Sequence, residues 1–219
     1  MNFYLPKTPN VIMRLLSRYV WRFSSSKKEI YLTFDDGPTE EITDFVLKEL
    51  HKYDAKATFF CLGKNIQAHP EIFKKIKNNG HRVGNHTQQH LNGWKTNKED
   101  YLENILKCEQ IIDTSEGHHK TGSTRQEQKL FRPPYGKIKK SQTTALLKKD
   151  YKIVLWDVLS ADFDKNISKE KCLKNVLENV QNGSIVVFHD SIKARAKVQF
   201  TLPIVLAELT SQGYIFKAI

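Results

Sequence analysis

The chain has 219 residues, of which 39% are hydrophobic and 27% are charged, and this balance excludes an intrinsically disordered protein and favours one α/β domain over two. The net charge of +11 favours an anionic partner, but the lysines are spread along the predicted helices without interleaved aromatic residues, so we expect no nucleic-acid site. Every apolar stretch falls well short of the ~20 residues of a membrane-spanning helix.

Residues 1–28 are predicted to form a helical extension ahead of a domain at 29–219. Thr8 is the expected cap, with Pro9 at the first helical position. We expect the apolar face of this helix to pack on the domain, through Val11, Ile12, Leu15, Leu16, Tyr19 and Val20. The alternative is peripheral membrane contact through residues 9–22, because Arg14, Arg18 and Arg22 lie opposite. The segment lacks the pattern of a signal peptide, which predicts a cytoplasmic protein, with an extracellular or cell-envelope location as the alternative.

Strand-like and helix-like segments alternate through the rest of the chain. Strands are expected at 30–34, 57–61, 82–85, 130–132, 152–157, 185–188 and 214–218, and helices at 40–53, 70–80, 97–112, 142–149, 168–182 and 201–212. This alternation predicts an α/β fold with parallel strands and right-handed crossovers. About seven strands is one fewer than a closed barrel has, so we expect an irregular, incomplete (β/α) barrel with outer helices. An open doubly wound sheet is the alternative.

Two further features of the sequence are a polar segment and three cysteines. Residues 114–129 predict an exposed loop, in which His118 and His119 face solvent. The cysteines are odd in number and widely spaced, which predicts free thiols rather than a disulfide framework and favours a reducing compartment: they are Cys61, Cys108 and Cys172.

Reactive side chains stand where the predicted strands end. Asp35 and Asp36 end the first strand, and Gly37 and Pro38 then turn the chain. Further candidates at strand ends are His86, Arg132, the stretch from Asp157 to Asp162, and His189. Active sites of parallel α/β folds form at the carboxyl ends of strands, so these residues predict one site.

Two of these positions suggest a metal centre. His86 and His90 are four residues apart, so one helical turn would place both rings on the same side. Two imidazoles with one carboxylate leave coordination positions open, which is typical of catalytic Zn²⁺ and also suits Co²⁺, Fe²⁺, Mn²⁺ or Ni²⁺. A chance surface pair is the alternative for the histidines alone, but the adjacent carboxylates favour the metal centre.

The ordered segments T-F-D-D-G-P, H-T-Q-Q-H, R-P-P-Y, W-D-V-L-S-A-D and V-F-H-D resemble the motif set of the polysaccharide deacetylases, the NodB-homology domain of carbohydrate esterase family four. The resemblance covers residues 29–219 and implies a metal-dependent hydrolase that removes acetyl groups from N-acetylated sugars of a peptidoglycan- or chitooligosaccharide-like glycan. It implies metal binding by Asp36, His86 and His90.

The resemblance also implies catalytic roles. Asp35 would be the general base that takes a proton from metal-bound water, and His189 the general acid that protonates the leaving amine. Arg132 would hold Asp35, and the backbone N–H of Tyr135 would stabilise the oxyanion. The expected substrate-pocket residues are Val187, where the family usually has Leu, together with Trp156, Phe163 and Pro134.

One motif departs from the family pattern. Leu159 stands where the family has the first Asp of its fourth motif, whose usual role is to pair with the acid histidine, and Phe163 stands where it has Trp. Asp162 or Asp157 would replace this partner, or His189 would titrate without one. The departure leaves two alternatives to the deacetylase: a catalytically weak relative that binds glycan or metal, and a hydrolase of a different C–N bond.

Overall fold

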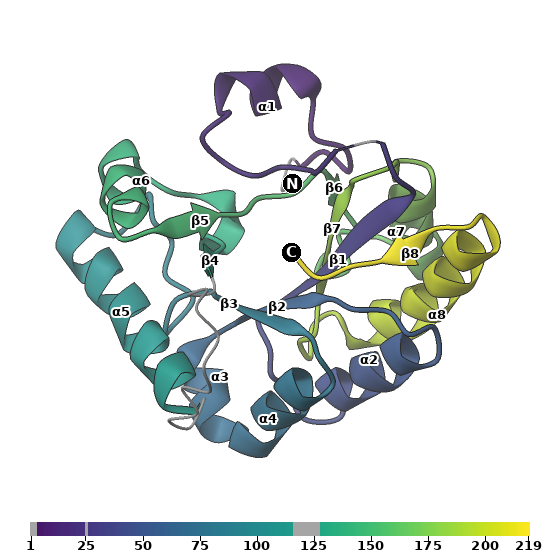
Figure 1. The fold of residues 1–219 in the computed structure, drawn as a ribbon, viewed down its shortest axis with the longest axis horizontal. Coiled ribbons are helices and arrows are strands. Elements are labelled where there is room, and N and C mark those ends of the chain that lie inside the picture. The colour runs from purple at the N-terminus through teal and green to yellow at the C-terminus, as the bar shows by residue number, and fades with distance from the viewer. Residues whose placement is uncertain (1–3, 25, 116–127) are drawn as a thin grey trace.

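The computed structural model describes residues 4–24, 26–115 and 128–219 (Figure 1). Among these residues the sheet has eight strands, seven of them in the order β5-β4-β3-β2-β1-β7-β6, with β8 paired to β1. The strands are β1 Glu29–Asp35, β2 Thr58–Cys61, β3 Arg82–Asn85, β4 Lys129–Phe131, β5 Tyr151–Ile153, β6 Val158–Leu159, β7 Ile185–His189 and β8 Ile215–Phe216. All of the ladders between them are parallel.

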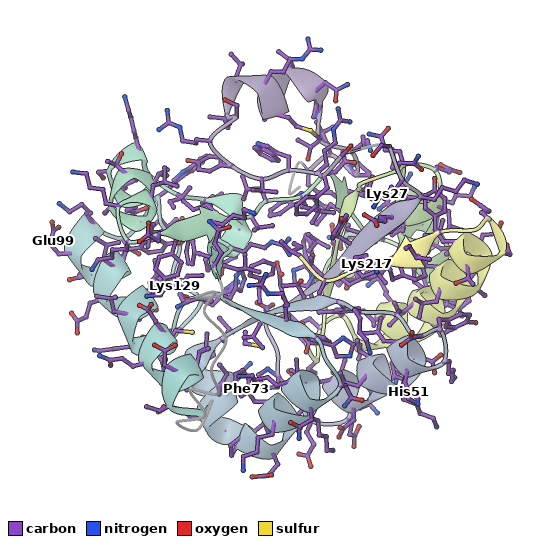
Figure 2. The ribbon with its side chains drawn as sticks, in the orientation of Figure 1. Lys27, His51, Phe73, Glu99, Lys129 and Lys217 are labelled. Atoms are coloured by element: carbon purple, nitrogen blue, oxygen red, sulfur yellow. The ribbon has the colours of Figure 1, made fainter. Side chains whose placement is uncertain are left out.

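The sheet curls, and α2 to α8 lie outside it (Figure 1). These helices are α2 Ile42–His51, α3 Gly63–Ala68, α4 Pro70–Asn78, α5 Lys98–Ser115, α6 Lys140–Leu147, α7 Lys169–Leu177 and α8 Arg195–Ser211. Figure 2 shows charged side chains such as Glu99 projecting from the outer surface of this ring. The predicted incomplete (β/α) barrel is therefore confirmed, and the open doubly wound sheet is wrong.

Apolar side chains fill both faces of the curled sheet. Between the sheet and the outer helices, the Phe34 ring stacks between Phe59 and Phe188, at centroid distances of 5.1 and 6.0 Å. Inside the barrel, Phe60 packs with Leu130, Val154 and Ile185. Burial of these side chains on both faces is the expected driving force for a parallel sheet.

The predicted strand at 152–157 is wrong beyond its first two residues: β5 ends at Ile153, and the next strand, β6, begins only at Val158, at the opposite end of the sheet. The reason is non-local. Residues 4–24, here called the N-terminal strap, cross the gap between these two strands. Val20 pairs with the β5 side, where its N–H donates to Ile153 O over 2.9 Å and its carbonyl accepts from Leu155 N over 2.8 Å. On the β6 side, Leu159 N donates to Pro6 O over 2.8 Å.

The helix of the strap differs from its prediction. Helix α1 (Asn10–Leu15) is only six residues long, and the Thr8 hydroxyl donates to Trp156 O over 2.8 Å instead of capping it. Its apolar face was expected to pack on the domain, and Tyr19 and Val20 do so, but Val11 and Leu15 are 62% and 76% exposed, and Ile12 and Leu16 are exposed too. The chain turns after Leu15 and reaches β5 at Val20, and Met13 is the residue of α1 that is buried.

Smaller differences concern the other helices. Helix α3 was not predicted, and α8 begins at Arg195, so Pro203 lies inside it rather than in its first turn. Much of the predicted loop at 114–129, with His118 and His119, lies outside the described residues. The cysteines are buried and free, as expected. Within the described ranges, each helix is too short or too polar to cross a bilayer.

Candidate metal and catalytic site

Asp35 and His189 lie side by side at the carboxyl edge of the sheet. They end β1 and β7 and are register partners in the parallel ladder. Asp36 follows with a φ of 80°, a left-handed conformation. Its backbone carbonyl accepts from Asn65 Nδ2 over 2.6 Å. The strand end and this turn therefore give the two adjacent carboxylates different directions.

Asp36, His86 and His90 converge, with one ligand atom of each within 4.8 Å of the others. Asp36 Oδ1 lies 3.2 Å from His90 Nε2 and 3.7 Å from His86 Nε2. In the described part of the chain this oxygen is buried without a well-directed hydrogen bond. Two imidazole nitrogens around an unsatisfied carboxylate oxygen are a donor set that fits a divalent cation.

Both histidines are neutral, as metal ligands must be. Burial is the main cause that lowers the pKa of His86 to about 3, and it also lowers the pKa of His90 below its usual value. His86 Nδ1 lies 2.7 Å from Arg132 O, and a carbonyl can only accept, so Nδ1 carries the proton and Nε2 keeps its lone pair for a cation. Tyr135 Oη lies 3.0 Å from His90 Nδ1.

The predicted helical turn between the two histidines is wrong. The segment has no helix, and Thr87 and His90 have positive φ values of 71° and 60°. The buried amide of Asn104 on α5 holds the loop, since its Oδ1 accepts from Gln88 N over 2.9 Å and from Gln89 N over 3.1 Å. Asn104 is a supporting residue that the sequence analysis missed, and its one signal was a polar residue on the buried side of that helix.

Arg132 fixes the candidate base. Its guanidinium is fully buried, lies 4.1 Å above the Phe60 ring centroid, and donates from Nη1 to Asp35 Oδ1 and to Thr33 Oγ1, both over 2.7 Å. Asp35 itself is 3% exposed. A charged pair this deeply buried, with extra hydrogen bonds, holds the carboxylate in one orientation.

Asp162 is the carboxylate partner of His189. Its Oδ1 lies 2.7 Å from His189 Nδ1, and its Oδ2 accepts from the backbone N–H of His189 over 2.7 Å. Burial lowers the pKa of His189, but the charge and hydrogen bond of Asp162, together with Asp36 and Asp35, outweigh it and raise the pKa to about 9. His189 is therefore protonated at neutral pH and able to act as an acid.

Asp157, the other candidate partner, lies elsewhere. It is fully buried and accepts from Lys7 Nζ over 2.7 Å and from Ser184 Oγ over 2.6 Å. Leu159 does not leave His189 without a carboxylate, because Asp162 takes that place.

The expected pocket residues lie close to the acid. Val187 and Leu159 belong to one apolar cluster, against which Trp156 and Phe163 pack. The Phe163 ring is 5.1 Å from the His189 ring, edge to face. Pro134 is buried next to Tyr135 in the short 3-10 turn η1 (Pro134–Gly136), and Tyr135 adopts a φ of 61° there.

Asp190 is a second supporting residue without a predicted role. Its Oδ1 accepts from Gly37 N over 3.0 Å and its Oδ2 from Thr43 Oγ1 over 2.6 Å, so it ties β7 to the turn after Asp36. Burial raises the pKa of Asp190 to about 7. A Cβ on Gly37 would lie 1.9 Å from Asp190 Oδ2, so this contact requires glycine at the turn.

Comparison with known proteins agrees with this geometry. The family model "Polysaccharide deacetylase" matches residues 23–154. A peptidoglycan-N-acetylglucosamine deacetylase of Bacillus cereus is 38% identical over 178 residues, which are 80% of this chain and 62% of that protein. A second Bacillus cereus protein of the same name is 34% identical, over 90% of this chain and 88% of that protein.

A solved structure is similar over nearly its whole length. It is the crystal structure of the Bc1960 peptidoglycan N-acetylglucosamine deacetylase in complex with 4-naphthalen-1-yl-N-oxidanyl-benzamide. The TM-score is 0.85 at 33% identity, covering 97% of this chain and 95% of that chain.

Proposed function

The chain belongs to the polysaccharide deacetylase family, and from this premise we propose that it is a metal-dependent hydrolase that removes acetyl groups from N-acetylated sugars of a glycan. The observation that carries the proposal is the convergence of Asp36, His86 and His90 beside two ion pairs, Asp35 with Arg132 and His189 with Asp162. The names of the relatives favour peptidoglycan as the glycan, with chitooligosaccharides as the alternative.

Asp36, His86 and His90 would hold the cation, and Zn²⁺ is the ion we expect. When bound, such an ion lowers the pKa of a water ligand to about 7 and polarises the amide carbonyl. The compound in the similar crystal structure carries an N-oxidanyl amide, which is a metal-chelating group, and this supports a cation at the corresponding place.

The other residues act on protons and on charge. Asp35, oriented by Arg132, takes the proton of the attacking water. His189, kept protonated by Asp162, delivers a proton to the leaving amine, a contribution of about 10²–10⁴-fold in related chemistry. The backbone N–H of Tyr135 stabilises the oxyanion, and Val187, Trp156 and Phe163 enclose the acetyl group.

A catalytically weak, glycan-binding relative was suggested by Leu159. The contact between Asp162 and His189 removes that argument, because the acid has a carboxylate partner. The deacetylase is therefore the function that the geometry supports best.

Acetate release from N-acetylated oligosaccharides, measured with added Zn²⁺ or Co²⁺, tests the proposal. We expect release that a chelator abolishes and added metal restores, and that Asp35→Asn or His189→Ala reduces by at least about 10²-fold. Metal binding without acetate release would support the binding relative, and ammonia in place of acetate a different C–N hydrolase.

Peripheral membrane contact and the compartment are further parts of the proposal. Exposed Val11 and Leu15 beside the exposed Arg14 and Arg18 support contact with an anionic lipid surface. The cytoplasmic location stays a prediction, which fractionation of native cells would test.

A further inference from the structure

A groove of about 310 Å³ lies between the N-terminal strap and the rim of the candidate site. Tyr135, Trp156 and Leu159 line it on the barrel side, and Tyr4, Ile12 and Trp21 on the strap side. This volume is at the lower end of small-molecule sites, which are commonly about 300–1,000 Å³. The strap therefore closes the gap in the barrel and also builds one wall of a groove.

Hydrogen bonds hold this wall in place. The indole N–H of Trp21 donates to Leu16 O over 3.0 Å, and the Tyr4 hydroxyl donates to Asp164 Oδ2 over 2.9 Å. The Thr8 hydroxyl ties the strap to the backbone of Trp156 over 2.8 Å. Since these polar groups are occupied, the wall presents mainly apolar and aromatic surface, and it is formed before a ligand arrives.

The groove is continuous with the catalytic residues. Tyr135 lines it and also contacts His90, with ring centroids 4.5 Å apart. On the other side, the Phe163 ring lies between the Tyr4 ring at 5.8 Å and the His189 ring at 5.1 Å. A ligand in the groove would therefore lie next to a sugar whose acetamido group sits at the metal triad.

We propose that this groove binds the neighbouring sugar of the same glycan chain, and that it prefers an uncharged ring; this proposal rests on the proposed deacetylase function. None of the described residues that line the groove is charged, and one of them, Leu159, stands where the family motif has Asp. An anionic sugar would lose its hydration there without a compensating cation, whereas the C–H face of a neutral pyranose can stack on Trp21 or Trp156.

Substrate length gives the test. We expect KM to fall from N-acetylglucosamine to chitobiose for the unmodified chain, because only the disaccharide has a neighbouring sugar. Ile12→Glu places a carboxylate in the groove and should raise the KM for chitobiose roughly threefold to tenfold, with little change in kcat or in the KM for N-acetylglucosamine. Leu15→Glu is the matched control, since Leu15 lies on the same helix, is 76% exposed and does not line the groove.

Calorimetric titration with the same two sugars separates this proposal from the function on which it rests. A Kd that is tighter for chitobiose than for N-acetylglucosamine, with the difference lost in Ile12→Glu and kept in Leu15→Glu, supports the groove. This holds even if no acetate is released, an outcome that would refute the deacetylase. Equal length dependence in both variants and the unmodified chain overturns the groove proposal. The proposal is also overturned if the protein is a dimer that Ile12→Glu dissociates while the dependence of binding on sugar length is unchanged. The groove would then bind a second copy of the chain.

Discussion

At the residue scale, the charge state of His189 depends mainly on one carboxylate. Burial alone would leave this imidazole neutral, and Asp162 reverses that outcome through a 2.7 Å contact. His189, the proposed acid, stays protonated up to about pH 9, whereas burial keeps the proposed metal ligands His86 and His90 neutral. The same residue type thus suits two proposed roles, set by its neighbours.

We predict that Asp162→Asn lowers turnover more than Asp157→Asn. With Asp162, His189 stays protonated until the pH rises through about 9; without that negative charge its pKa falls, so the basic limb of the pH–rate profile moves to lower pH. The expected loss at pH 7.5 is about 10²-fold. Acetate release measured between pH 5 and pH 10 checks both the loss and the shift. Equal or reversed effects of the two variants would refute the assignment.

At the element scale, α5 supports a loop that carries two predicted ligands. The Asn104 amide accepts two backbone hydrogen bonds from the residues between His86 and His90. Because both ligands belong to a loop and not to a helix, this support takes the place of helical hydrogen bonds.

We predict that Asn104→Leu weakens Zn²⁺ binding by about 10- to 100-fold, the usual effect of losing an outer support of a metal site. Asn104→Asp keeps the acceptor oxygen and should recover most of the affinity. Calorimetric titration of the metal-free protein with Zn²⁺ measures both variants. An unchanged Kd in Asn104→Leu would show that the loop holds its shape without α5.

Sequence patterns predicted the elements whose reasons are local. The runs that form β1, β2 and β7 are mostly apolar, and polar or turn residues end or follow β1, β3, β4 and β7, so these strands and the convergence of their ends could be expected. Most predicted site residues follow from that convergence and from the family motifs. The left-handed backbone of Thr87 and His90 has no such signal, and the loop that contains them is held by an amide 16 residues beyond Gln88.

The split between β5 and β6 was unpredictable for a related reason. Residues 152–157 contain no Gly or Pro that would mark a break. The strand ends at Ile153 because Val20, more than a hundred residues earlier, hydrogen bonds to Ile153 and Leu155, and Pro6 hydrogen bonds to Leu159 in the next strand, β6. Contacts over such separations leave no trace in local periodicity.

At the scale of the whole molecule, a partly buried ion pair anchors the strap. Lys7 Nζ contacts Asp157 Oδ2 over 2.7 Å and also donates to Asn179 O over 2.7 Å. The Asp157 side chain is fully buried, whereas that of Lys7 is 29% exposed. Loss of the lysine would leave a carboxylate in the interior without its cation.

We predict that Lys7→Met lowers the free energy of unfolding by about 2–4 kcal/mol, less than for a fully buried pair because water reaches Lys7. Adding Asp157→Asn should recover most of this loss, since the stranded charge is then gone. Urea unfolding of the two single variants and the double variant measures the coupling. Additive losses would show that the pair contributes nothing beyond its separate residues.

The strap also bears on how the protein is made. Its contact with Asp157 spans 150 residues, so the strap finds its place only after the intervening residues and Asp157 have been synthesised. Until then the edges of β5 and β6 have no partner, and the nascent protein exposes backbone groups on which other chains could pair. Closure of the barrel is therefore a late event in biosynthesis, and a strap that docks slowly would lower the yield of native protein before it affected any finished molecule.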